Sequence, residues 1–131
     1  MKIEYLKRKL NNLPHDDHFN HPEKLDIIMN KVPRSIPSDQ LIVASYVASD
    51  EWYVFTTLGI GVYHSSWIFY RYSEIESLES QLSTMLASGQ TKAELDHFNL
   101  KMRNEITVTI RFKNPGLCYS VWGILNSALI E

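Results

Sequence analysis

The chain has 131 residues, of which 44% are hydrophobic and 21% charged, values expected for one globular domain with a single core. The net charge of −2 argues against a broad nucleic-acid surface and against recruitment to anionic lipid, because both need clustered Lys and Arg. A single cysteine, Cys118, excludes an intrachain disulfide and is expected to be a buried, inert thiol. No segment has the ~20 apolar residues that cross a bilayer, and no signal peptide is recognisable, so the cytoplasm is the expected location.

Apolar residues three and four positions apart predict an N-terminal helix on the stripe Ile3, Leu6, Leu10 and Leu13. Its basic residues lie mostly off this stripe, and we expect the helix to pack on its own domain. Pro14 ends the pattern, and a second helical segment runs from Pro22 to just before Pro33. With the connection PRSIPSD, residues 1–39 are therefore expected to form a helical extension and linker that precede a folded unit at residues 40–131.

The stretch HDDHFNH at residues 15–21 raises the question of a metal site, with His15, His18 and His21 as candidate ligands. It lies between two prolines, is too short to orient four ligands, and matches no H-E-x-x-H pattern. A polar break between two helices, with Asp16 or Asp17 capping a turn, is the favoured interpretation. We expect no metal and no cofactor, and a metal-dependent protein centred on this stretch remains the alternative.

From Gln40 the period of the apolar residues changes from that of a helix to that of a strand. Four β-rich segments follow, separated by short turns: LIVASYVA, WYVFTT, IGVYH and WIFYRY. This arrangement predicts an antiparallel meander. Its many aromatic residues suit strands that pack on at least one face.

The segment from Ser73 to residue 104 allows two interpretations. Ser73 with Glu76, and Thr91 with Glu94, have the form of capping boxes, and Gly89 would end the first helix of a helical hairpin. The sequence DHFNLKM can also be an alternating strand that places on one face Phe98, Leu100 and Met102. Both interpretations stay open at this point.

The C-terminal part predicts a strand followed by a helix. ITVTIRFK alternates, with the inward residues Ile106, Val108, Ile110 and Phe112. After NPG, the segment LCYSVWGILNSALIE has a wide apolar helical face formed by Leu117, Val121, Trp122, Leu125, Ala128 and Leu129. This helix is expected to close the core.

The middle of the chain resembles the first half of bacterial PH-like domains. The matching residues are Thr56, Thr57, Gly59, Tyr72, Ser73, Glu74 and Ile75, within residues 40–79, and the last strand and C-terminal helix also fit. The resemblance implies an α+β fold, an antiparallel PH-like β-barrel or strongly bent sheet, capped by a C-terminal helix and preceded by one or two N-terminal helices. It also implies a binding scaffold for lipids, peptides or proteins, with no shared catalytic residues.

No pattern typical of an enzyme is present. His64 is followed by two serines, but there is no G-x-S-x-G elbow, and no glycine loop could hold a phosphate. We therefore expect a non-catalytic protein-binding module, for instance an immunity protein that neutralises a cognate bacterial toxin one-to-one. A PH-like lipid-binding module is the alternative from another class. The candidate partner contacts are Asp50, Glu51, Trp52, Tyr63 and Trp67, taken as an acidic turn beside exposed aromatic residues.

The expectation for HDDHFNH can be tested on native protein purified without a chelator. Elemental analysis should find no stoichiometric transition metal, because the segment lacks a complete ligand set. A variant with His15, His18 and His21 all changed to Ala should have the same metal content as the wild type. A stoichiometric metal that is lost in this variant would contradict the expectation.

Overall fold

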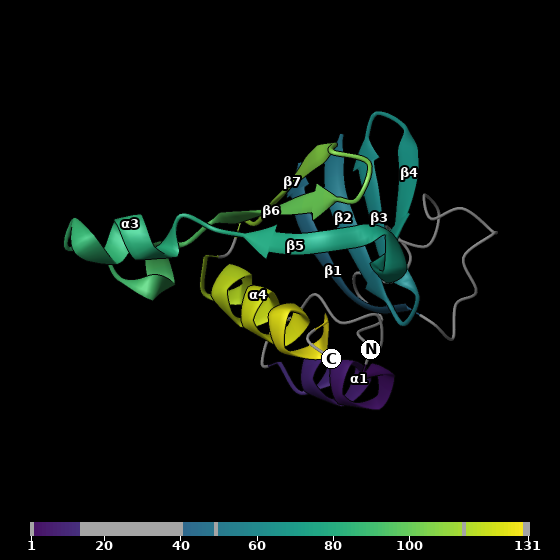
Figure 1. Cartoon of the computed structure of the whole chain (residues 1–131), viewed down its shortest axis with the longest axis horizontal. Coiled ribbons are helices and arrows are strands. Elements are labelled where there is room, and N and C mark those ends of the chain that lie inside the picture. The colour runs from purple at the N-terminus through teal and green to yellow at the C-terminus, as the bar shows by residue number, and fades with distance from the viewer. Residues whose placement is uncertain (1, 14–40, 49, 114, 130–131) are drawn as a thin grey trace.

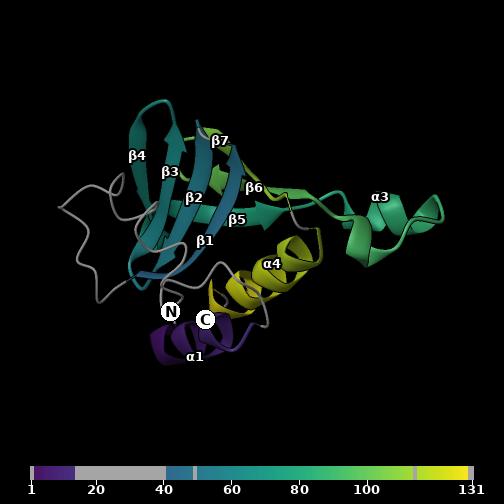
Figure 2. The same ribbon diagram turned by 180° about the vertical axis from the view of Figure 1, so that it is seen from behind.

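The computed structural model describes residues 2–13, 41–48, 50–113 and 115–129. The predicted second helix, the PRSIPSD connection and the HDDHFNH stretch lie outside these residues. Within them the fold is α+β, with two antiparallel sheets, a short N-terminal helix and a longer C-terminal helix (Figures 1 and 2).

The four-stranded sheet is the meander that the sequence predicts. Its strands follow chain order: β1 (Leu41–Ala48), β2 (Glu51–Thr56), β3 (Gly59–His64) and β4 (Trp67–Arg71). A 3₁₀ turn, η2 (Tyr72–Glu74), then leads into the three-stranded sheet. That sheet contains β5 (Ile75–Glu79), β6 (His97–Met102) and β7 (Thr107–Arg111).

Among the described strands the two sheets do not close into a barrel, which is one of the two forms that the resemblance implies beside a strongly bent sheet. The ladder pairs of the described strands lie within one sheet or the other. Where β1 approaches β7, the Ser45 hydroxyl donates to the Arg111 carbonyl at 3.2 Å. At this seam a side-chain contact, in place of a backbone ladder, connects the sheets, and they share one core.

The segment after Ser73 is mainly strand, and the first capping box is wrong. Ile75 pairs with Met102 and Leu78 with Leu100, so β5 is an edge strand of the second sheet. The local sequence favours a helix here, but strand pairing is the more stable arrangement. Pairing buries Ile75, whereas a helix would leave β6 without a neighbour on this side. A helix forms only farther on, as α3 (Leu82–Ala87), which ends just before Gly89 at φ +88°.

The excursion between β5 and β6 projects away from both sheets (Figures 1 and 2). None of the α3 residues is buried. A second 3₁₀ turn, η3 (Lys92–Glu94), brings the chain back, and fully buried Leu95 anchors it to the core. The Lys92 ammonium lies 5.0 Å from the centre of the Tyr119 ring on the C-terminal helix.

The alternating interpretation of DHFNLKM is confirmed, since Phe98, Leu100 and Met102 are all buried. The predicted inward pattern of the last strand holds for Ile110 and Phe112. It fails for Ile106, which is 51% exposed because it lies in the turn before β7 begins.

Two helices close the core from one side. The helix α4 (Pro115–Leu129) lies under β5, and α1 (Ile3–Asn11) lies beneath α4 in the same view (Figure 1). Leu6 and Leu10 of α1 are fully buried in the main core, as the spacing of the apolar stripe predicts, and the Lys2 amide donates to the Ala128 carbonyl at 3.2 Å. The α4 residues completely or almost completely buried are Leu117, Cys118, Val121, Leu125 and Ala128.

The single thiol is buried, as expected. Burial, and to a lesser degree the charge of Asp96, raise the pKa of Cys118 to about 12, so the thiol remains protonated near neutral pH.

A tight corner joins the β2–β3 hairpin to the end of β4. The Thr56 hydroxyl accepts from the amides of Leu58 and Gly59, both at 3.0 Å, and donates to the Gly59 carbonyl at 2.9 Å. The Tyr72 hydroxyl donates to the Thr56 carbonyl at 2.8 Å, and the Tyr72 amide donates to the Leu58 carbonyl at 3.1 Å. Residues that carry the PH-like resemblance therefore contact one another in space.

Two glycines give a matched test of this corner. A Cβ at Gly59 would lie 2.2 Å from the Tyr70 carbonyl oxygen, whereas a Cβ at Gly123 in α4 would meet nothing within 4 Å. Gly59→Ala should lower the free energy of unfolding by about 1 to 3 kcal/mol, since backbone would have to move. Gly123→Ala should raise it by up to ~1 kcal/mol through helix propensity. Urea denaturation measures both, and equal effects of the two changes would contradict this account.

Candidate functional site

The aromatic residues expected at a partner surface form one row across the four-stranded sheet. Tyr46 faces Trp52, Trp52 faces Tyr63, and Tyr63 faces Trp67 in the strand register. The ring centres of Trp52 lie 5.5 Å from Tyr63 and 5.3 Å from Trp67, in tilted and edge-on arrangements. The three aromatic candidate contacts, Trp52, Tyr63 and Trp67, therefore lie together on one face of the sheet, with Tyr46 at the end of the row.

Their expected exposure is wrong for Trp52, which is 1% exposed. It belongs to a second, smaller core cluster with Leu41, Ala44 and Val54, against which Tyr63 and Trp67 pack half-buried. The Trp52 indole N–H has no hydrogen-bond partner in the described part of the chain. The row is therefore mainly a packed face, and only Tyr46 at its end is well exposed.

The two acidic residues at the first turn, Asp50 and Glu51, lie in different environments. Asp50 is exposed, and its carbonyl accepts from the Ser65 amide at 3.2 Å. The Glu51 carboxylate is 12% exposed and receives a bidentate contact from Arg111, whose Nε and one Nη each lie 2.9 Å from a Glu51 oxygen. Glu51 is therefore committed to a contact between β2 and β7 and is not a free acid for a partner.

Tyr53 and His64 complete this contact, which we call the Glu51 clamp (Glu51, Tyr53, His64 and Arg111). The Tyr53 hydroxyl donates to Glu51 at 2.5 Å and lies 3.0 Å from the His64 Nε2. Burial, followed by the hydrogen bond and charge of Glu51, raises the pKa of Tyr53 above its ordinary value. The phenol is therefore held protonated as a donor, and the cluster connects β2 and β3 of the first sheet to β7 of the second.

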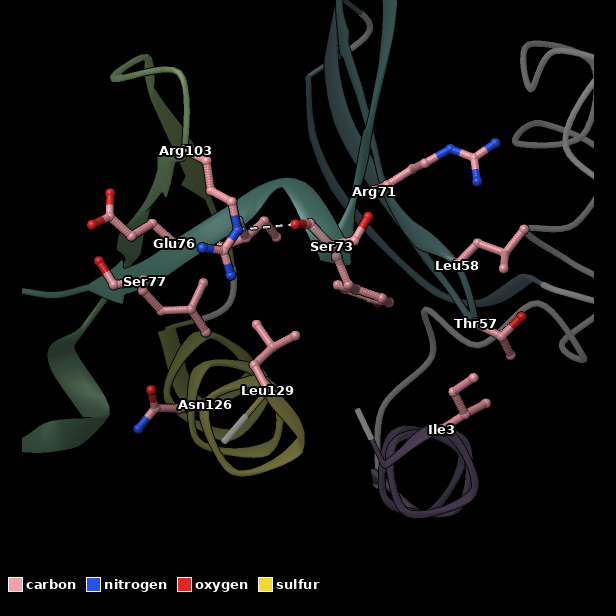
Figure 3. Close-up of a pocket in the computed structure, with 13 residues that line it drawn as sticks. Ile3, Thr57, Leu58, Arg71, Ser73, Glu76, Ser77, Arg103, Asn126 and Leu129 are labelled. Atoms are coloured by element: carbon pink, nitrogen blue, oxygen red, sulfur yellow. Dashed lines mark hydrogen bonds between the residues drawn. The ribbon is translucent and has the colours of Figure 1, made fainter. Parts of the chain in front are cut away.

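A concavity of the described chain lies elsewhere, between β5 and the two helices (Figure 3). It is an open groove of about 720 Å³, and we call it the β5 groove. Its walls come from the start of α1, the β2–β3 turn, the end of β4, η2, β5, the turn after β6, and the end of α4. The volume falls in the range of ligand-binding clefts in proteins.

The lining of the β5 groove is mixed. Its apolar side chains are Ile3, Leu58, Ile75, Leu78 and Leu129. Ile3 and Leu58 are 43% and 42% exposed, so part of this apolar surface faces solvent. Hydroxyl, amide and charged side chains make up the rest.

Two arginines and one carboxylate line the same groove. The Arg103 Nε donates to the Ser73 carbonyl at 3.1 Å, and its backbone amide donates to the Glu74 carbonyl at 2.9 Å, which fixes the turn against η2. In Figure 3 the Arg103 guanidinium lies over β5 toward the groove, whereas the Arg71 side chain points away from it. Glu76 supplies the carboxylate.

Sequence reasoning did not find either the Glu51 clamp or the β5 groove. Glu51 and Arg111 are 60 positions apart, and the groove is built from five separate parts of the chain. The only local signal was the motif that contains Thr57, Tyr72 and Ser73, all of which line the groove.

No family model, no curated protein and no solved structure matches the chain. Among the described residues no three His, Cys, Asp or Glu side chains gather as a metal-binding group. In the same ranges no helix is long and apolar enough to span a bilayer.

Tyr53→Phe should change the response of stability to alkaline pH. Because folding raises the pKa of Tyr53, its contribution is complete below pH 10.0, the ordinary value, and is lost as pH rises above it. The wild type should thus lose up to ~1.4 kcal/mol more per pH unit than the variant above that value. Urea unfolding at about pH 8 and about pH 11 measures this difference. Val62→Ala, a core change on the same sheet face without a titrating group, should keep the wild-type slope; identical slopes for all three proteins would contradict the assignment.

Proposed function

We propose that the chain is a non-catalytic protein-binding module and that the β5 groove is its binding surface. The observation that carries the proposal is an open groove with solvent-facing apolar residues on its walls, Ile3 and Leu58. Solvent-facing apolar side chains next to fixed polar groups are typical of surfaces that bind another macromolecule.

The contacts of other polar groups also support a binding role. The polar groups of the Glu51 clamp are engaged in contacts between strands, and the Cys118 thiol is buried and held protonated. The α+β fold, with two antiparallel sheets and a C-terminal helix, is the coarse part of the fold that the PH-like resemblance implies. Such scaffolds bind through surfaces that differ from member to member.

The more specific version is an immunity protein that blocks a cognate toxin by one-to-one binding in the cytoplasm. Its support is the small size and mild acidity of the chain. This version requires that a neighbouring reading frame encode the toxin. If no such frame exists, the immunity role fails while the binding role stands.

The lipid-binding alternative has one supporting observation. Lys7, Arg8 and Lys9 are all exposed on α1, while Leu6 and Leu10 of the same helix are buried. A membrane role therefore predicts salt-sensitive flotation with anionic liposomes and none with neutral ones. Absence of flotation in both cases would remove this alternative.

Two substitutions at solvent-facing positions test the groove without opening the core. Leu58→Asp and Ile3→Asp should each weaken binding to the neighbouring gene product at least tenfold, because each places a charge in the apolar part of the interface. Ile106→Asp is the matched control, since Ile106 is 51% exposed and lies outside the groove. It should change affinity less than twofold.

Isothermal titration calorimetry gives affinity and stoichiometry for each variant, and circular dichroism confirms that each is folded. Equal loss of affinity in the control and the groove variants, or no loss in any, would contradict the placement of the binding surface.

A further inference from the structure

The β5 groove follows the edge of a strand and not only one of its faces. Four consecutive residues of β5, Ile75 to Leu78, all line it. Successive side chains of a strand point to opposite faces, so a cavity that touches every residue in turn must lie along the strand's edge. The β5 groove is therefore a channel beside the backbone of β5.

That edge has no strand partner among the described residues. The order of the second sheet is β5-β6-β7, which leaves one side of β5 unpaired. α4 runs below this side in Figure 1, and the end of α4 forms the opposite wall of the groove through Asn126 and Leu129. Alternate residues of an edge strand direct their N–H and C=O groups away from the sheet, where an added strand can pair with them.

The shape of the groove suits an extended polypeptide. A peptide that adds to a sheet edge gains affinity from main-chain hydrogen bonds. Its alternate side chains contact the surfaces on either side of the edge, and these contacts give specificity. Here the apolar contacts available to those side chains come from Leu58, Leu78 and Leu129. A compact ligand would use the apolar wall but would leave the strand edge unpaired.

The charge at the groove points to an acidic residue in that peptide. The Arg103 Nε is occupied by the Ser73 carbonyl, which orients the guanidinium and leaves both Nη groups for another acceptor. The ion pairs among the described residues do not include Arg103. Glu76 also lines the groove and adds a negative charge to it. This residue lies at the irregularity between Ile75 and Ser77, where the regular strand pairing with β6 is interrupted.

We propose that the β5 groove binds an extended segment of a partner protein, which pairs with the free edge of β5 and places an Asp or Glu side chain on Arg103. This inference rests on the proposed function and specifies the chemistry of the partner. The bound segment adds a fourth strand to the second sheet. The carboxylate accepts hydrogen bonds from the two Nη groups of Arg103, which have no acceptor among the described residues, and neighbouring apolar side chains of the segment contact the leucines of the wall.

The probe is a phage-displayed library of random ten-residue peptides, selected on the full chain. Enriched peptides should share one Asp or Glu with apolar residues two positions away, as strand periodicity requires. Arg103→Glu should weaken a selected peptide at least tenfold, and selection on this variant should enrich Lys or Arg at the same position. Arg8→Glu on the exposed face of α1 is the matched charge reversal and should change affinity less than twofold.

The pairing with β5 has its own readout. Methylating peptide amides at alternate positions should abolish binding for one set of positions only, because one set faces β5. Amide exchange of β5 residues should slow when the peptide binds.

The outcomes separate this inference from the proposed function. Peptides that lose affinity with Leu58→Asp but not with Arg103→Glu would overturn the acidic specificity and leave the protein-binding groove intact. Peptides that tolerate amide methylation at every position would overturn strand addition. If no peptide is enriched and groove substitutions leave binding to the neighbouring gene product unchanged, both proposals fail.

Discussion

The corner formed by Thr56 and Tyr72 sets the relative position of everything around the β5 groove. Tyr72 holds the β2–β3 hairpin at two carbonyls. Its hydroxyl donates to the Thr56 carbonyl, and its amide donates to the Leu58 carbonyl. Gly59 allows the backbone of β4 to approach so closely that no Cβ would fit. Because Tyr72 is also the first residue of η2, the same contacts fix the direction in which the chain leaves the first sheet and begins β5. The groove depends on that direction, since β5 forms one wall and the β2–β3 turn part of another.

The opposite end of the sheets is held by a different kind of interaction. β1 and β7 approach without a ladder, and the Glu51 clamp connects β2 and β3 to β7 by charge-assisted hydrogen bonds. A carboxylate only 12% exposed is costly to desolvate, and the bidentate guanidinium together with the Tyr53 hydroxyl offsets that cost. The apolar core between the sheets, closed by α4, supplies the nonspecific part of the stability. The clamp contributes alignment of the sheets, which burial alone does not specify.

Local patterning predicted the elements of this fold well wherever side chains alternate or repeat on one face. The four strands of the meander follow from period alone, and so does the burial of Leu6 and Leu10 on the α1 stripe, although Ile3 of that stripe is 43% exposed. For β6 the alternating pattern was one of two open interpretations, and the structure decides in its favour. Local patterning failed at Ser73 and Glu76, whose capping-box spacing is genuine but is outweighed by pairing between Ile75 and Met102, a contact invisible to a local window. It failed in another way at Trp52, because alternation assigns a residue to a face but does not say whether that face is covered. The candidate site is the part of the structure that local patterning predicts least, because its walls come from separate parts of the chain that meet only after the corner at Tyr72 has formed.

One edge of β5 has no strand partner among the described residues, and an edge of this kind can pair with other chains; the sequence of β5 limits that risk. The strand has only five residues, begins with an irregularity in its pairing, and carries Glu76 and Glu79. Short length, local distortion and charge are the features that keep edge strands from pairing with one another indiscriminately. Two copies of β5 edge to edge would bring these like charges together, whereas a segment that carries a carboxylate opposite Arg103 gains an attraction that offsets repulsion from Glu76. These like charges disfavour edge-to-edge pairing of two copies, and for this reason we propose an acidic extended segment, in place of a second copy of the chain, as the partner of this edge.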